Sequence, residues 1–546
     1  MKNKTFLLLC VTSLGLSLIT SACAGRKRRG DDDQEDPTKA NITVGTLDKG
    51  IGTAWLENAA KDFEELYKDA TNFQEGRVGV KVSVKGSTQY NGSYLETASL
   101  NHDIYFTEGI AYRELSKKGK FMDITSIVNE KLTDYSENKT IMEKIDSTMA
   151  DFLTVDNKVY GIPFYDSFYG MVYDIDLWNE QKLYLSKGGQ FVNKSGDLSL
   201  GTDNQAGTLD DGLPSTYEEF DKLIKKMLDK GIIPYLASQR GIEYTANYLY
   251  NIFADYEGLD NMKQNITLSG TSTDLVDTIG EDGAITYKPA TAISEDNGYE
   301  LQRQVGRYKT LKFFNDVLVN NPNNYNQKLE ATHTGAQSSF INGHQLGKPI
   351  GMLIEGSWWE NEAKHAFETY IDTYGADQRH NYAIMPIPFE NAEKAAACNY
   401  KHTYLSLSHS FGIVSNSAKN KDLALEFMKF LHTDKMLSAF TRDTSITRPL
   451  NYEISEADQA NLTTYAKSLI DLKKNSNVFY PYSSNQFQID NNLYFNAFNW
   501  TWNTTINGTT YRHPWMYFTT VKNPSVTAYF DGQYTYFRNL WSSLQR

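Results

Sequence analysis

The sequence predicts an α/β fold, because strand patterns and helix patterns alternate along the chain. Valine occupies every second position from 78 to 84 and alternates with small or polar residues, which is typical of a β-strand with one buried face. A short β run at Ile42 and Val44 precedes this strand, and apolar residues between Trp55 and Leu66 recur at helical spacing. The order strand, helix, strand over 42–84 favours parallel pairing with a right-handed crossover.

Two later helices are predicted from a cap and from an apolar stripe. Glu219 follows Thr216 at the spacing of a capping box, in which each side chain accepts a hydrogen bond from the other residue's backbone. Apolar residues then recur over 220–227. A second stripe of apolar residues falls on one helical face over 422–431.

Two stretches, 186–214 and 261–297, are rich in Gly, Ser, Thr, Asn and Asp, and we expect them to be insertions or long surface loops. Within the first, oxygen-bearing side chains alternate in a glycine-containing loop, a pattern that can hold a hard cation. The loop lacks the terminal glutamate of a complete EF-hand, so a structural Ca²⁺ site and a plain polar turn both stay open. The residues of the calcium hypothesis are Asp203, Gln205, the Leu209 carbonyl and Asp211.

The N-terminus has the pattern of an export signal that ends in a lipid-modified cysteine. Two lysines precede an apolar run over 6–19, shorter than the about 20 residues of a membrane span, and small residues then lead to Cys23. We therefore expect residues 1–22 to be a lipoprotein signal peptide and Cys23 to be acylated, with ordinary cleavage nearby as the alternative. Residues 23–40 would form a flexible linker, because they are mostly charged or polar and have little to bury.

Charge and cysteine content restrict the partners and the sources of stability. The chain has 54 Lys and Arg against 67 Asp and Glu, a net charge of −13, and loss of two lysines with the signal peptide makes it −15. Phosphate backbones repel an acidic body, so we expect no nucleic-acid partner. Of the three cysteines, only Cys398 would remain free once Cys10 is cleaved off and Cys23 is acylated, so no intrachain disulfide is expected.

The sequence contains no complete catalytic or nucleotide-binding motif. Residues 50–54 begin like a dinucleotide-binding loop, but Trp55 stands where the third glycine must pack closely. The nine histidines form no His-Glu-x-x-His, and Gly-x-Ser-x-Gly does not occur. We therefore expect a binding protein that is not an enzyme and requires no cofactor. A pair of carboxylates from distant segments, as in glycosidases, is the arrangement that keeps an enzyme as an alternative.

Aromatic residues give the strongest indication of a ligand, since the chain has 36 Tyr, 27 Phe and 8 Trp. Trp358 and Trp359 follow a predicted buried strand over 352–356 and would lie beyond its carboxyl end, where ligands bind in open α/β sheets. Flat apolar faces beside carboxylates, amides and hydroxyls suit pyranose rings, although core packing is the alternative for each indole. A second aromatic group, in a segment rich in Asn and Thr, comprises Trp500, Trp502, Trp515 and Tyr517.

Five stretches carry a family resemblance through their order and spacing: DIYF at 103–106, KVYGIP at 158–163, GTLDDGLPSTY at 207–217, MLIEGSWWENEA at 352–363 and FGIV at 411–414. From about residue 41 to its end, the chain resembles the extracellular solute-binding proteins of bacterial ABC importers. Within that family it is similar to the maltodextrin-binding-protein-like group, family 1, which includes large sugar-binding lipoproteins. An aromatic residue familiar in maltodextrin binders is absent after 103–106, which argues against that ligand.

The resemblance implies a two-lobed α/β fold of the periplasmic-binding-protein type (type II), with a ligand cleft between the lobes. By that pattern the first lobe comprises 41–164 plus 405–449, and the second comprises 165–404 plus 450–546. The ligand-binding residues that we expect are Asp48, Lys49, Thr107, Glu108, Tyr165, Asp166, Ser167, Gln239, Tyr244, Glu355, Trp358, Trp359, Arg448, Trp500 and Trp502.

The expected function is therefore the substrate-binding lipoprotein of an ABC transporter, which captures a carbohydrate, most simply an oligosaccharide, and delivers it to membrane permease subunits. We expect a monomer held by its lipid on the extracellular face of the bacterial cell membrane. The alternatives are an exported glycan-active enzyme and a glycan sensor or adhesin of the same fold.

Overall fold

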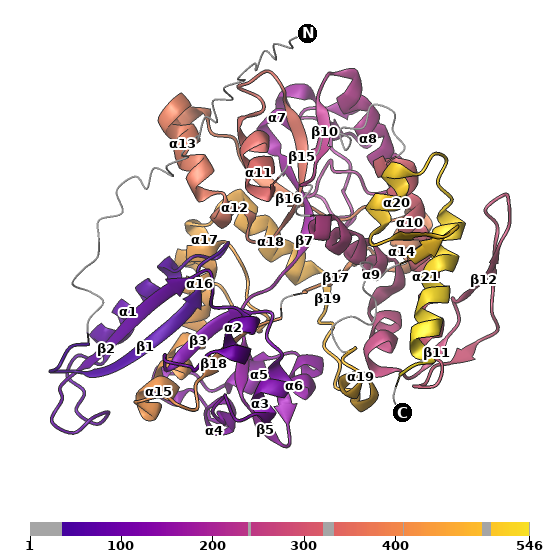
Figure 1. Ribbon diagram of the computed structural model, residues 1–546. Helices are drawn as coiled ribbons and strands as arrows, with labels where there is room; N and C mark the ends of the chain where they lie inside the picture. Colours follow the sequence, from indigo (N-terminus) through magenta and orange to yellow (C-terminus); the bar gives the residue numbers. More distant parts are fainter. Residues whose placement is uncertain (1–34, 239–241, 320–331, 408, 494–503, 545–546) are drawn as a thin grey trace, which may run out of the picture.

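The computed structural model describes residues 35–238, 242–319, 332–407, 409–493 and 504–544. Two α/β lobes lie side by side, the lower one formed mainly by the N-terminal part of the chain (Figure 1). The predicted signal peptide and Cys23 lie outside the described residues. Within the described ranges, no helix is both long enough and apolar enough to cross a membrane.

The first lobe is built on a five-stranded sheet of order β2-β1-β3-β18-β6. β1 pairs parallel with β2 and β3, whereas β18 runs antiparallel to β3 and β6. The parallel unit of β1, α1 and β2 confirms the order predicted for 42–84. The strands and the crossover helix are β1 (Ala40–Leu47), α1 (Ala54–Leu66), β2 (Val80–Ser87), β3 (Ile104–Glu108), β6 (Gly161–Pro163) and β18 (Ser410–Val414).

The predicted valine strand begins two residues late. Val78 is exposed and precedes β2, because Gly79 has a φ of +79° and turns the chain before the sheet begins. Val80 and Val82 are buried as expected.

Helices surround this sheet, and α1 packs against α15 and α16. Trp55 of α1 contacts Phe106 of the sheet and Phe440 of α16 with ring centroids 5.3 and 5.0 Å apart. α15 confirms the helix predicted over 422–431. The remaining elements of this lobe and its border are α2 (Gly92–Thr97), α3 (Tyr112–Lys117), α4 (Thr125–Asn129), the 3₁₀ turn Thr133–Tyr135, α5 (Ile141–Lys144), α6 (Ser147–Leu153), β4 (Thr154–Val155), β5 (Lys158–Val159), α15 (Lys421–Leu431), α16 (Asp434–Thr444) and α17 (Glu456–Ala460).

The second lobe is built on a four-stranded sheet of order β10-β15-β7-β16. β10 pairs parallel with β15, and β7 runs antiparallel to both β15 and β16. Its strands are β7 (Tyr169–Asp174), β10 (Ile233–Leu236), β15 (Ile350–Gly356) and β16 (Tyr382–Met385). Every residue of β7 and β15 is buried, as in a sheet covered on both faces.

Helices cover the second sheet, and α9 contacts both β7 and β15. Thr216 caps α8 by accepting from the Glu219 backbone, but Glu219 binds Ser215 instead of closing the predicted capping box. The helices of this lobe are α7 (Ile175–Gln181), α8 (Tyr217–Asp229), α9 (Ile242–Thr267, kinked at Gly258), α10 (Val305–Phe313), a π-helical turn (Phe314–Val319), α11 (His333–Asn342), α12 (Trp359–Glu362), α13 (Lys364–Tyr374), α14 (Ala392–Ala397), α18 (Thr464–Asn475), α19 (Gln486–Asp490), α20 (Pro514–Thr520) and α21 (Val526–Trp541), with 3₁₀ turns at Gly298–Arg303 and Ala376–Gln378.

The two polar stretches that were expected to be loops contain small two-stranded ladders, and α9 extends into the second of them as far as Thr267. Short strands also pair elsewhere in this lobe. The pairs are β8 (Tyr184–Leu185) with β9 (Phe191–Val192), β11 (Thr271–Ser272) with β14 (Thr291–Ala292), β12 (Val276–Ile279) with β13 (Ile285–Tyr287), β17 (Thr403–Leu405) with β19 (Asn477–Phe479), and β20 (Thr504–Ile506) with β21 (Thr509–Tyr511).

Each lobe has its own hydrophobic core. Residues from Ala40 to Tyr165 and from Phe411 to Leu450 build the first core, and those from Phe168 to Leu405 build most of the second. Tyr480 and Tyr482 return from the C-terminal part of the chain to the first core. The chain therefore crosses between the lobes several times.

The crossing segments are tied together by the carboxylate of Asp166, which is fully buried. Its Oδ1 accepts from the hydroxyls of Ser406 (3.0 Å) and Tyr480 (3.2 Å). Its Oδ2 accepts from the Thr447 hydroxyl (2.7 Å) and from Lys473 Nζ (2.8 Å), which supplies the opposite charge. One carboxylate therefore joins four segments that are distant in the sequence.

Replacing Asp166 should destabilise the whole protein. We expect Asp166→Ala to lower the free energy of unfolding by about 3–5 kcal/mol, because it leaves Lys473 without its buried partner. The measurement is denaturant-induced unfolding followed by tryptophan fluorescence. Asp197→Ala is the control, since Asp197 is an exposed partner of exposed Lys187, and it should change stability by less than about 0.5 kcal/mol. Equal effects of the two variants would contradict this role of Asp166.

Candidate functional site

Trp358 lies where the two lobes meet, just beyond the end of β15. Three tyrosine rings meet its indole ring edge-on: Tyr165, Tyr169 and Tyr244, with centroids 6.3, 5.3 and 5.8 Å away and interplanar angles of 86°, 89° and 75°. Tyr165 belongs to the first core, whereas Tyr244 packs against the second. The half-buried indole therefore contacts both lobes.

A loop of the first lobe, residues 48–53, approaches Trp358 from the other side. A Cβ atom at Gly50 would lie 2.7 Å from Cδ1 of Trp358, so only glycine allows this close approach of the backbone. Asn361 of α12 donates from Nδ2 to the Gly50 carbonyl oxygen at 2.7 Å. The half-buried Asp48 and the exposed Lys49 precede Gly50 in the same loop.

The rings of Trp358, Tyr165, Tyr169 and Tyr244 are called the aromatic group below. Tyrosine hydroxyls connect this group to the polar side chains around it. Tyr165 donates to Oε1 of Glu108 at 2.8 Å, and burial raises the pKa of Tyr165. The ring of Tyr244 contacts Trp358, and burial, reinforced by the negative charges of Glu355 and Glu362, raises the pKa of Tyr244 as well. Both phenols therefore stay protonated at neutral pH and keep their capacity to donate and accept hydrogen bonds.

A buried acid lies beneath this group. Burial, reinforced by the negative charge of Glu362, raises the pKa of Glu355 to about 8. Gln337 donates from Nε2 to Oε1 of Glu355 (3.1 Å) and to Oε2 of Glu362 (2.6 Å), and His333 lies 3.6 Å from Glu362. Because Glu355 is neutral at neutral pH, the two carboxyl groups lie close together without full charge repulsion.

The structure brings together part of the set of ligand residues expected from the sequence. Six of the expected residues are linked to Trp358 by a hydrogen bond, by a ring contact or through a neighbour in the chain. These six are Asp48, Lys49, Glu108, Tyr165, Tyr244 and Glu355. Their binding of a ligand stays a prediction. Gln239, Trp500 and Trp502 lie outside the described residues.

Five other expected ligand residues have buried side chains with partners inside the protein, and their binding of a ligand stays a prediction. Asp166 holds the crossing segments together, as described above. Trp359 packs in the second core against Phe340, Phe367, Tyr382 and Tyr465. The remaining three are Thr107, which donates to the Tyr90 carbonyl (2.7 Å), Ser167, whose backbone N–H binds Ser406, and Arg448, which donates to the Pro163 carbonyl (2.9 Å).

Several residues of the site were missed by the sequence analysis. Asn361 and Glu362 stand directly after the Trp358-Trp359 pair, so their place in that stretch was a usable signal. Tyr169 begins the first strand after the crossing between the lobes, so its place in the chain also could have indicated that it belongs to the site. Gln337 and His333 lie on α11 with no local pattern to mark them, since only the packing of α11 against β15 brings them to the site.

The loop proposed for Ca²⁺ uses its carboxylates to close its own turns. Asp203 accepts from the Gln205 backbone (2.8 Å), and Asp211 accepts from the Gly207 backbone (2.7 Å). Asp210, which was not among the expected ligands, accepts from the backbone and hydroxyl of Thr202. These bonds describe a polar turn, and calcium binding by Asp203, Gln205, Leu209 and Asp211 stays a prediction.

A two-lobed α/β fold with an aromatic group between the lobes defines a class of ligand-binding proteins, and comparison of the chain with known families agrees. The family described as bacterial extracellular solute-binding protein matches residues 58–467. The chain therefore belongs to that family, and the fold expected from the sequence is confirmed. A search of curated protein sequences found no match.

Solved structures with the same fold are similar at low identity. RafE from Streptococcus pneumoniae, in its apo form, is 15% identical with a TM-score of 0.53, over 93% of this chain and 100% of RafE. A chitin oligosaccharide binding protein is 13% identical with a TM-score of 0.52, over 92% and 100%. The GacH receptor of Streptomyces glaucescens is 12% identical with a TM-score of 0.51, over 93% and 100%. At these identities the likeness shows the fold.

The buried acid gives the protein a pH-dependent stability. Because folding raises the pKa of Glu355 from its usual 4.5 to about 8, the folded chain retains a proton that the unfolded chain has lost between these values. The free energy of unfolding therefore falls as pH rises through this window, by up to about 1.4 kcal/mol per pH unit from this group.

We expect Glu355→Gln to make stability depend less on pH than in the parent protein. The measurement is denaturant unfolding at several values between about pH 5 and pH 8. Glu368→Gln, at an exposed position on α13, is the matched control and should keep the parent slope. If Glu355→Gln keeps the parent's dependence of unfolding free energy on pH, then Glu355 is ionised in the folded protein over this whole pH range.

Proposed function

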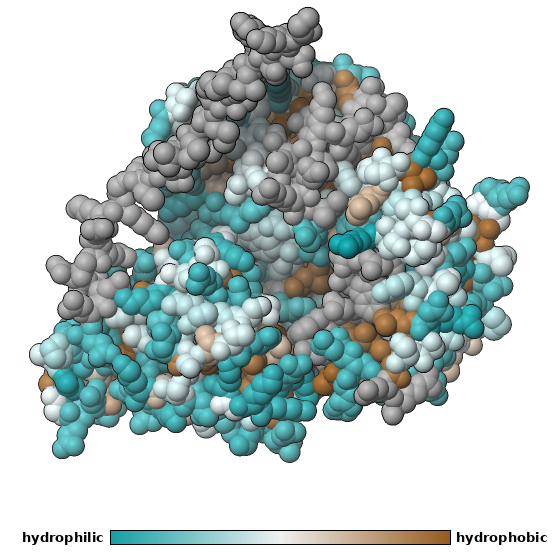
Figure 2. All heavy atoms as spheres, viewed as in Figure 1, coloured by the Kyte–Doolittle hydropathy of each residue, from teal (hydrophilic) through white to brown (hydrophobic). Residues whose placement is uncertain are grey.

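We propose that this protein is the substrate-binding component of an ABC importer and that it binds a carbohydrate between its lobes. The observation that carries the proposal is the position of Trp358, a half-buried indole that contacts both lobes and is surrounded by tyrosines and carboxyl groups. Membership of the extracellular solute-binding family supports the transport role. The surface is recessed between the lobes, as Figure 2 shows.

The chemistry of the site suits a sugar. A pyranose has an apolar C–H face that stacks on an aromatic ring, and a rim of hydroxyls that both donate and accept hydrogen bonds. Asp48 and Glu108 offer acceptors, Lys49 offers a donor, and the tyrosine hydroxyls serve as both. Two proteins of the same fold support the ligand class by their descriptions, RafE in complex with raffinose and the chitin oligosaccharide binding protein.

Closure of the lobes would couple binding to delivery. Two hydrogen bonds join α12 to the first lobe: Asn361 donates to the Gly50 carbonyl, and Glu360 accepts from the Ser445 hydroxyl. Contacts of this kind between the lobes are what a closed state needs. A ligand that touches both lobes favours the closed state by the difference between its affinities for the two states. The permease would then recognise the closed form, and acylation at Cys23 would keep the protein at the extracellular face of the membrane.

A glycosidase is less favoured by this site. A general acid must reach the glycosidic oxygen, but Glu355, the acid with the raised pKa, is buried with its oxygens accepting from Gln337 and the Gly356 backbone. Recovery of intact oligosaccharide after incubation with the protein would support binding without cleavage. A shortened product would favour the enzyme.

The ligand class is tested by a thermal-shift screen of the mature protein against a glycan panel that includes raffinose and chito-oligosaccharides. We expect at least one member to raise the melting temperature, because binding to the folded state alone stabilises it. If no glycan in a broad panel does so, the carbohydrate proposal fails.

For the ligand found in this way, we expect Trp358→Ala to weaken binding by about 2–4 kcal/mol, or roughly 30- to 1000-fold, because it removes the stacking surface between the lobes. Isothermal titration calorimetry measures the change. Tyr287→Ala, at an exposed aromatic of β13, is the control and should bind like the parent. Parent-like affinity in Trp358→Ala would move the site elsewhere.

A further inference from the structure

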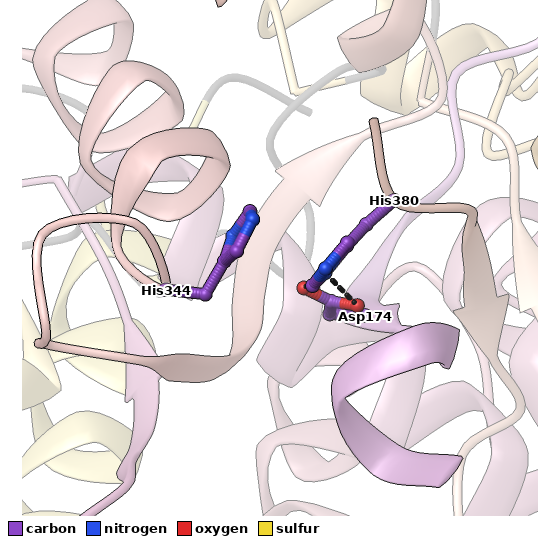
Figure 3. A group of neighbouring side chains, drawn as sticks. All are labelled: Asp174, His344 and His380. Atoms are coloured by element: carbon purple, nitrogen blue, oxygen red, sulfur yellow. Dashed lines mark hydrogen bonds and ion pairs between the residues drawn. The ribbon is translucent and has the colours of Figure 1, made fainter. Parts of the chain in front are cut away.

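Two histidines and an aspartate meet at the outer end of the second sheet, away from Trp358. Asp174 ends β7, His344 follows α11, and His380 precedes β16 (Figure 3). One ligand-type atom from each of the three side chains lies within 4.8 Å of those of the other two. Since Asp174 is five residues from Tyr169 along β7, the cluster lies roughly 17 Å from the end of the strand that faces Trp358.

The hydrogen bonds around His344 leave its Nδ1 atom without a hydrogen-bond partner. The Tyr370 hydroxyl donates its one hydrogen to the Gln378 carbonyl oxygen at 2.8 Å, so it must accept from Nε2 of His344, which lies 2.8 Å away. His344 therefore carries its proton on Nε2, and its Nδ1 presents a lone pair. That Nδ1 is buried and has no hydrogen-bond partner. A buried acceptor without a partner is costly, which makes this atom a candidate ligand.

His380 supplies a second nitrogen, already directed at a carboxylate. Its Nδ1 lies 2.9 and 2.7 Å from the two oxygens of Asp174, and its ring stacks on that of His344 with centroids 3.8 Å apart. The buried carboxylate of Asp174 beside this nitrogen would offer an oxygen ligand and a negative charge to a metal cation.

We propose that Asp174, His344 and His380 form a binding site for a divalent transition-metal ion of the zinc class. Zinc takes imidazole nitrogen and carboxylate oxygen at about 2.0–2.2 Å, which places ligand atoms about 3.4 Å apart. The two rings would therefore turn out of their stacked arrangement so that each directs a nitrogen lone pair at the ion. The ion would displace the hydrogen that Nδ1 of His380 donates to Asp174, which leaves as a proton to solvent, and water would complete the coordination. The bond from Nε2 of His344 to Tyr370 is the supporting contact that metal-binding histidines commonly make.

A bound ion would join three chain segments of the second lobe. The end of β7, the turn after α11 and the segment before β16 are distant in sequence and meet here. The ion would therefore stabilise this lobe, and it would not contact a ligand beside Trp358. This proposal stands apart from the proposed transport function, so the two can fail independently.

The test uses the mature protein, stripped of metal and without a histidine tag, titrated with Zn²⁺ in competition with a chromogenic chelator. We expect one Zn²⁺ per chain, and a loss of affinity of at least about tenfold in His344→Ala and in His380→Ala. His365→Ala is the control, because His365 lies on the exposed face of α13 and should bind Zn²⁺ like the parent. Glycan binding should stay within about twofold in all three variants, given the distance between the sites.

A measurement on the parent protein keeps the test independent of how the variants fold. Zn²⁺ should protect His344 and His380, but not His365, from modification by diethyl pyrocarbonate, as read by peptide mass spectrometry. Absence of Zn²⁺ binding, unchanged affinity in both cluster variants or lack of this protection would overturn the proposal. The cluster would then be an ion pair of His380 and Asp174 covered by a stacked imidazole.

Discussion

The buried carboxylate of Asp166 is the interaction on which the relation between the lobes depends. Burying a charge is costly, and it is tolerated here because Lys473 neutralises it and hydroxyls of Ser406, Thr447 and Tyr480 fill its remaining acceptor positions. These donors come from three segments of the chain, around 406, around 447 and over 473–480. The crossings therefore share one anchor.

This anchor also places the aromatic group. Tyr165 precedes Asp166 directly, and Tyr169 follows it at the start of β7, so the segment that carries the anchor also carries two of the three rings around Trp358. Trp358 itself arrives on β15, which pairs with β7 through Gly356 and Tyr169. The crossing at Asp166 and the candidate site are therefore built on the same paired strands, β7 and β15.

The Trp358-Trp359 pair shows how far local patterns reach. Both indoles follow the same strand, and the sequence placed them beyond its end without separating them. In the structure Trp359 turns into the core as the first residue of α12, whereas Trp358 remains half-buried between the lobes. The family resemblance also implied ligand contacts for Asp166 and Arg448, and in the structure long-range partners bury both side chains. Position along the chain indicated the candidate site, and packing decided which of the two indoles lies between the lobes.

The sequence by itself determined the α/β class, the parallel unit at the N-terminus, the helices at α8 and α15, and the family to which the chain belongs, because these depend on local periodicity, caps and ordered motifs. Only the tertiary structure decided the anchor at Asp166, the bridge from Gln337 to Glu355 and Glu362, and the cluster of Asp174, His344 and His380. Those groups join residues that are tens to hundreds of positions apart or lie on elements with no local mark. Burial and hydrogen bonding between such residues arise only once the sheets and helices have packed.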